Sequence, residues 1–195
     1  GKCTGVEISD QGRLAFIGDS LTARSIYTTQ IETYLKLCAG YRNLKARQFG
    51  VPGNVTLSIA KRMSDILAWK PTIATLQCGM NDGFYGCYSD WMGNNYVGGF
   101  RSVIRDLKGI NCSILVATPT VMDPDFGKPN SIYAKKCDAA TYNQTLEKLS
   151  EFTEKIAVEE KVPKVELFQL MRRIMIQCKE KYGSNFQLVG TDGIH

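Results

Sequence analysis

The chain has 195 residues, of which 44% are hydrophobic and 22% are charged, and its formal net charge is +5. This composition is typical of one globular domain with its own hydrophobic core. No apolar run approaches the roughly 20 residues of a membrane-spanning helix, and the basic residues are dispersed among acidic ones. Neither a membrane span nor a nucleic-acid partner is therefore expected.

Short apolar runs alternate with segments of helical periodicity along the chain. Strands are predicted at residues 13–17, 44–49, 72–77, 113–118 and 164–167. Amphipathic helices are predicted between and after these strands, on apolar stripes over residues 27–38, 57–67, 96–107, 142–156 and 171–182. Elements that alternate in this way form parallel βαβ units, so the predicted fold class is α/β, a three-layer α/β/α sandwich with a parallel sheet of about five strands.

The ends of the first three strands carry residues that can do chemistry, and ligands of such sheets bind beyond the carboxyl ends of the strands. A Gly-Asp-Ser-Leu segment places Ser20 where it can cap a helix or act as a nucleophile. After the second strand, Gly50 or Gly53 can form a turn or present its N–H to a reacting oxygen. After the third strand, Asn81 can form a turn or donate its side-chain amide to an oxyanion.

The only histidine, His195, follows Asp192 by three positions. A serine hydroxyl is a weak nucleophile until a base takes its proton, and that base is usually an imidazole held by a carboxylate. If Ser20 is such a nucleophile, His195 must be its base, because the chain has no other histidine. The carboxylate of Asp192 can fold back and accept from Nδ1–H, which sets the tautomer of the ring. A plain surface turn remains the alternative for this segment.

These segments occur together in an order that resembles the four sequence blocks of the SGNH (GDSL) hydrolase family. The blocks are Gly-Asp-Ser-Leu, a glycine after the second strand, Gly-x-Asn-Asp and Asp-x-x-His, and the resemblance spans residues 16–195. The Gly-Met-Asn-Asp-Gly segment and the Thr-Pro turn at 118–119 are similar to those of bacterial GDSL-type esterases. The resemblance implies a flavodoxin-like SGNH hydrolase fold in a single domain over residues 1–195, with a final helix after His195 that the chain lacks.

The resemblance also implies a role for each of the candidate site residues, and it implies that no metal or organic cofactor is needed. Ser20 is then the nucleophile, His195 the general base and Asp192 the residue that orients it. The oxyanion hole comes from the Ser20 amide, the Gly53 amide and the Asn81 side chain. Gly53 is preferred over Gly50 because Gly-x-x-Thr at 53–56 matches the family pattern that leads into a helix.

The substrate is expected to be a small-molecule or carbohydrate ester. Aromatic residues follow Asn81 and are predicted to line the mouth of the site, where they would stack on a sugar ring or pack a lid: Phe84, Tyr85, Tyr88 and Trp91. The preferred function is a carbohydrate O-acetylesterase for short-chain acyl esters. The alternatives are a lysophospholipase or thioesterase of the same family, and a catalytically silent glycan-binding module. A dinucleotide site is excluded because no G-x-G-x-x-G follows a strand.

Seven cysteines, an odd number with no Cys-x-x-Cys spacing, argue against a zinc or thioredoxin-type centre. Both a disulfide-bearing exported protein and a reduced protein with buried thiols fit this count. A secreted or periplasmic location is slightly favoured over a cytoplasmic one. The pairing of the cysteines and the oligomeric state are left open.

Overall fold

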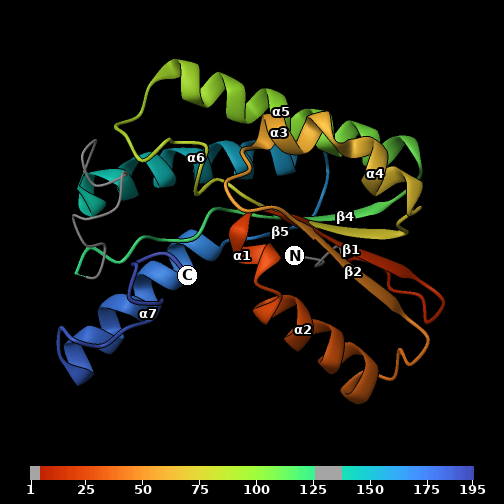
Figure 1. Cartoon of the computed structure of the whole chain (residues 1–195), viewed down its shortest axis with the longest axis horizontal. Helices are drawn as coiled ribbons and strands as arrows, with labels where there is room; N and C mark the ends of the chain where they lie inside the picture. Colours follow the sequence, from red (N-terminus) through yellow and green to blue (C-terminus); the bar gives the residue numbers. More distant parts are fainter. Residues whose placement is uncertain (1–4, 126–137) are drawn as a thin grey trace.

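A parallel five-stranded sheet forms the middle layer of the computed structural model, which describes residues 5–125 and 138–195 (Figure 1). The strand order is β2-β1-β3-β4-β5, and each neighbouring pair is parallel. The predicted α/β fold class is confirmed. The strands are β1 (Arg13–Gly18), β2 (Lys45–Gly50), β3 (Ile73–Gln77), β4 (Ser113–Ala117) and β5 (Lys164–Val165).

Helices cover both faces of the sheet (Figure 1). One face carries α3 (Thr56–Lys61), α4 (Met63–Ala68), α5 (Asp90–Gly109) and α6 (Ala139–Glu159). The other face carries α1 (Ser20–Ala23), α2 (Ile26–Thr33), the π-helix η1 (Tyr34–Cys38) and α7 (Leu167–Tyr182). The larger core lies between the sheet and α3–α6, and its strand members are Ala15, Ile17, Phe49, Ala74, Leu76, Ile114 and Val116. The central strands β1, β3 and β4 are covered on both faces and read as largely apolar runs, which is why the sequence pattern located them.

Three predicted elements differ from the structure. The helix predicted over residues 57–67 is divided at Arg62 into α3 and α4. The fifth strand ends at Val165, because Leu167 already begins α7 and Phe168 of that helix is buried in the core. The stripe predicted over residues 27–38 is divided between α2 and η1, and Ile31 and Tyr34 on it are exposed. The i→i+5 bonding of a π-helix rotates side chains away from the regular helical period, so the stripe does not form one buried face.

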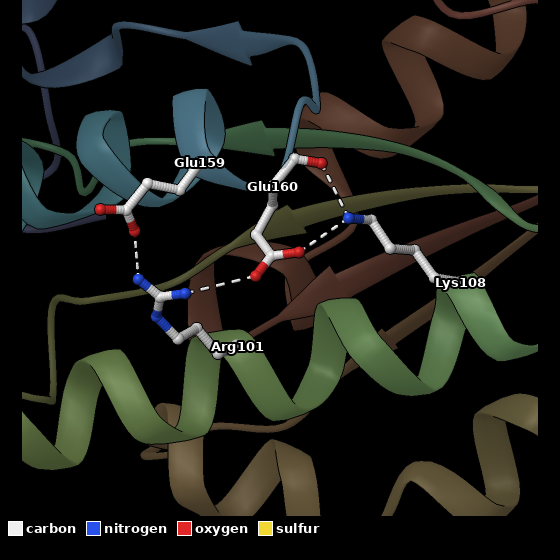
Figure 2. Close-up of polar contacts among 4 residues, drawn as sticks. All are labelled: Arg101, Lys108, Glu159 and Glu160. Carbon is white, nitrogen blue, oxygen red and sulfur yellow. Dashed lines mark hydrogen bonds and ion pairs between the residues drawn. The ribbon is translucent and has the colours of Figure 1, made fainter.

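An ion-pair network joins α5 to the end of α6, as Figure 2 shows. The guanidinium of Arg101 contacts the carboxylates of Glu159 and Glu160. The Nζ of Lys108 lies 2.7 Å from the Glu160 carbonyl oxygen and 2.7 Å from its carboxylate. A cation at a helix C-terminus satisfies a carbonyl that has no partner within the helix. Exposed ion pairs each contribute little to the free energy of folding, so the main effect of the network is to link α5 to the end of α6.

Within residues 5–125 and 138–195, no helix is both long enough and apolar enough to cross a membrane. The described cysteines include free thiols at Cys38, Cys78, Cys112 and Cys178. Cys3 and Cys137 lie outside the described residues.

Candidate active site

Ser20 lies directly after β1, at a sharp turn that only small residues permit. A Cβ on Gly18 would lie 2.1 Å from Thr22 Oγ1 and 2.4 Å from the Gln77 carbonyl oxygen, so the position requires glycine. Asp19 caps α1 by accepting a hydrogen bond from Leu21 N at 3.0 Å. Because Asp19 supplies the cap, the hydroxyl of Ser20 is left for another partner.

That partner is the terminal histidine. His195 Nε2 lies 2.8 Å from Ser20 Oγ, and His195 Nδ1 lies 2.5 Å from Asp192 Oδ2. The other oxygen of Asp192 accepts from the backbone N–H groups of Ile194 and His195, each at 3.0 Å. Burial alone would raise the pKa of Asp192, but the hydrogen bonds from His195 and Ile194 lower it to about 2. The structure thus joins a serine, an imidazole and an ionised carboxylate in one series.

The loop that carries this histidine is fixed to the body of the protein. Asp123 N donates to the Gly193 carbonyl oxygen at 2.8 Å. The carboxylate of Asp123 is fully buried, and Lys179 Nζ lies 2.5 Å from its Oδ1. Ile194 is buried in a cluster that includes Phe168 of α7. These contacts hold the segment between Asp192 and His195 against α7, although it lies at the end of the chain.

Asn81 presents its side-chain amide beside the loop that follows β2. Its Nδ2 donates to the Asn54 carbonyl oxygen at 3.1 Å, and its Oδ1 accepts from the Tyr85 hydroxyl at 3.1 Å. A primary amide has two N–H groups. With one directed at Asn54, the other has no partner among the described residues and can donate to a reacting oxygen.

The two candidate glycines, Gly50 at the end of β2 and Gly53 in the loop that follows, differ in their surroundings. Gly50 donates its N–H to Gln48 Oε1 at 2.6 Å, and a Cβ on it would lie 2.4 Å from Ala23 N. Gly50 therefore packs against α1 and has no free N–H. Gly53 has φ +75° and no atom within 4 Å of its Cβ position. Of the two, only Gly53 borders open space and is a candidate oxyanion donor.

Two residues that the sequence analysis did not assign hold this loop in place. Asp82 is buried, and its Oδ1 accepts from Thr56 N at 2.8 Å and from Thr56 Oγ1 at 2.7 Å. Burial raises the pKa of Asp82 to about 7, against the opposing effect of the Thr56 hydrogen bonds. The guanidinium of Arg62 donates to Asn54 Oδ1 at 2.8 Å and to the Phe49 carbonyl oxygen at 2.6 Å. A sequence signal existed only for Asp82, which follows Asn81 in the third block.

The aromatic residues after Asn81 divide into two groups. Phe84 is 40% exposed and Trp91 is 62% exposed, and their ring centroids lie 5.5 Å apart. Tyr88 is half-buried, with its ring beside Phe152. Tyr85 departs from the expectation that it lines the mouth, because it is only 8% exposed and turns inward to Asn81. Phe84 and Trp91 are thus the rings open to a substrate.

The described residues contain no group of three His, Cys, Asp or Glu side chains that could hold a metal ion. The contacts among Ser20, His195 and Asp192 can support nucleophilic chemistry on an acyl group.

Known structures share this fold. A gut microbial diltiazem-metabolizing enzyme, BT4096, matches all of this chain with a TM-score of 0.80 at 20% identity, and the match covers 45% of that enzyme. The chain thus spans less than half of that relative. The acetyl xylan esterase AlAXEase matches 94% of this chain, and 90% of its own, with a TM-score of 0.74 at 18% identity.

A catalytic mutant of Axe2, an acetylxylan esterase from Geobacillus stearothermophilus, matches 96% of this chain and 88% of its own, with a TM-score of 0.71 at 17% identity. At these identities the likeness shows the fold. No curated protein sequence matches the chain. The model of the GDSL-like lipase/acylhydrolase family matches residues 16–187, from the end of β1 past α7. The chain therefore belongs to the GDSL-like lipase/acylhydrolase family.

Proposed function

We propose that the chain is a carbohydrate O-acetylesterase that cleaves short-chain acyl esters by transferring the acyl group to Ser20. The observation that carries the proposal is the unbroken hydrogen-bonded series from Ser20 through His195 to Asp192. A nucleophile, a base and an orienting carboxylate in contact are what activates a serine hydroxyl. The likeness to structures described as acetyl xylan esterases supports the acetyl-carbohydrate class.

The reaction proceeds in two halves. Ser20 Oγ attacks the ester carbonyl carbon while His195 Nε2 takes its proton, and the carbonyl π pair moves onto the oxygen. The N–H groups of Ser20, Gly53 and Asn81 stabilise that oxyanion, which exists only around the transition state. Collapse breaks the acyl C–O bond, and His195 returns its proton to the leaving alcohol. Water then repeats the sequence on the acyl-enzyme, releasing the acid and restoring Ser20.

The exposed pair of rings, Phe84 and Trp91, is the proposed contact for the carbohydrate. These rings lie in the sequence shortly after Asn81, one of the proposed oxyanion donors, and both are exposed. Planar aromatic faces suit the apolar face of a sugar ring, and bulky rings near the carbonyl leave little room for a long acyl chain. The proposal therefore pairs a sugar alcohol with a short acyl group.

The nucleophile is tested with a fluorophosphonate probe, which labels activated serines. The wild-type chain should be labelled at Ser20, and Ser20→Ala should lose both labelling and hydrolysis of p-nitrophenyl acetate. Ser64→Ala, an exposed serine on α4, serves as the matched control and should behave as wild type. Absence of labelling in the folded wild-type protein would favour the silent glycan-binding module.

The substrate class is tested with esters of one alcohol that carry two to eight acyl carbons. Acetyl esters should give the highest kcat/KM, although each methylene that fitted a pocket would improve binding by up to about 0.8 kcal/mol. Trp91→Ala should raise KM for acetylated xylo-oligosaccharides and leave p-nitrophenyl acetate hydrolysis near wild type. Tyr34→Ala is the control, because Tyr34 is 63% exposed on η1. A steady rise in kcat/KM towards eight carbons would replace the carbohydrate substrate with a lipid or thioester.

A further inference from the structure

We infer that Tyr85 is a positioning residue for the reaction: its hydroxyl holds the Asn81 amide in the one orientation that aims an N–H at the reacting oxygen. This inference rests on the proposed function, in which Asn81 is an oxyanion donor. It assigns Tyr85 a part in the chemistry in place of the contact with substrate that the sequence suggested.

The amide of Asn81 is held at both ends. Its nitrogen donates to the Asn54 carbonyl oxygen, and its oxygen accepts from the Tyr85 hydroxyl, each at 3.1 Å. A rotated amide would bring its oxygen against the Asn54 oxygen and its nitrogen against the Tyr85 hydroxyl. Asn54 therefore disfavours the wrong orientation, while Tyr85 stabilises the right one. Donation to the amide oxygen also polarises the group, which makes the remaining N–H a better donor.

The backbone turns sharply between Asn81 and Tyr85, and this turn brings the Tyr85 hydroxyl back to the Asn81 side chain. Phe84 and Tyr85 have φ values of +49° and +55°, a left-handed conformation that is uncommon for two consecutive aromatic residues. Phe84 N donates to the Asn81 carbonyl oxygen at 3.0 Å, so the chain turns tightly between the two residues. Conformations of this kind cost free energy and persist where the surrounding structure imposes them.

The ring of Tyr85 is held in place by its packing against Tyr142. It stacks on Tyr142 with centroids 5.1 Å apart, and the Tyr142 hydroxyl donates to the Met80 carbonyl oxygen at 2.5 Å. Tyr142 can approach this closely only because position 83 is glycine: a Cβ there would lie 2.7 Å from the Tyr142 ring. The hydroxyl is thus fixed before any substrate binds.

A donor aligned in advance acts on the transition state, because the oxyanion forms only there. Loss of the Tyr85 hydroxyl should therefore lower kcat and leave KM unchanged. The effect should be smaller than that of losing the Asn81 amide, since Asn54 still restrains the nitrogen.

The experiment measures kcat and KM for p-nitrophenyl acetate in Tyr85→Phe, Asn81→Ala and the double variant. Tyr85→Phe keeps the stacked ring and should lower kcat roughly tenfold, the equivalent of one hydrogen bond. In the Asn81→Ala background the same change should have no further effect. Tyr96→Phe is the matched control, because it removes a buried hydroxyl whose hydrogen-bond partner is Thr153 Oγ1, at 2.6 Å, rather than Asn81. It should lower the melting temperature without changing kcat.

Two results would overturn the inference about Tyr85 and leave the proposed function standing. One is a kcat of Tyr85→Phe within twofold of wild type, and the other is the same fold-loss of kcat when Tyr85→Phe is made in the Asn81→Ala background. Full turnover in Ser20→Ala and Asn81→Ala would overturn the proposed function, and this inference with it. If Tyr85→Phe does not fold, the inference can still be tested by NMR relaxation on the wild-type protein. The ¹⁵N order parameter of the Asn81 side-chain amide should be close to the value of about 0.85 of rigid backbone, and a value below about 0.6 would refute a fixed amide.

Discussion

Asp192→Asn isolates the role of the carboxylate, because the structure dictates how the new amide must lie. Asp192 Oδ1 accepts two backbone N–H groups within the loop, from Ile194 and His195, so the amide oxygen of the variant must stay at this position. The amide nitrogen then takes the place of Oδ2, which lies 2.5 Å from His195 Nδ1. An N–H facing Nδ1 forces the imidazole proton onto Nε2.

The consequence falls on the serine. With Nε2 protonated, the ring donates to Ser20 Oγ across the observed 2.8 Å contact and cannot accept the serine proton. Serine-triad enzymes lose on the order of 10⁴ in kcat when this carboxylate becomes an amide, which corresponds to about 5 kcal/mol of transition-state stabilisation. Initial rates with p-nitrophenyl acetate should show this loss, and the rate of fluorophosphonate labelling should fall in parallel.

The matched control is Asp138→Asn. Asp138 caps α6 by accepting from Thr141 N at 2.7 Å, and it forms the same kind of local turn away from the histidine. The kcat of the Asp138→Asn variant should stay at the wild-type value, and circular dichroism should show that both variants are folded. A decrease of less than tenfold in a folded Asp192→Asn variant would refute the assignment of the carboxylate as the residue that sets the tautomer.

Two further predictions concern the neighbours of the nucleophile. Asn81→Ala should lower kcat by about 10² to 10³ with little change in KM, and an effect confined to KM would make Asn81 a substrate-binding residue instead. Asp82→Asn should flatten the dependence of stability on pH. The pKa of Asp82 is raised from 3.8 to about 7, so the folded state binds more protons than the unfolded state between these values, and stability falls as pH rises through this window. The amide retains the oxygen that accepts from Thr56 and cannot ionise, so the variant should lose less unfolding free energy, by about 1–3 kcal/mol, between pH 4 and 8 in urea titrations. Parallel titration curves for the two proteins would show that Asp82 does not titrate in this range.

The course of the chain through the sheet was predictable from local pattern alone. Strands buried on both faces leave continuous apolar runs, and the stripes between them follow the helical period. Parallel strands end at one edge of the sheet, so residues after β1 and β3 had to lie near one another. The presence of a single histidine reduced the choice of base to one residue. Composition and order were therefore enough to nominate Ser20, His195 and Asp192, which the structure joins by hydrogen bonds.

Contacts between distant segments decided the rest. Apolar residues continue after Val165, and the sequence alone does not show whether they extend the strand or begin α7. The contact of Phe168 decides this: its backbone N–H donates to Thr118 Oγ1 at 3.0 Å, and the two residues are fifty positions apart in the sequence. The apolar pattern of a sequence shows which residues are apolar, but it does not show which residues they contact in the folded protein. Tyr85 could therefore be placed after Asn81 but not turned inward, and Gly50 could not be separated from Gly53 until Gln48 was seen to occupy its N–H. Side-chain hydrogen bonds depend on ångström-scale positions that only the packed tertiary structure determines.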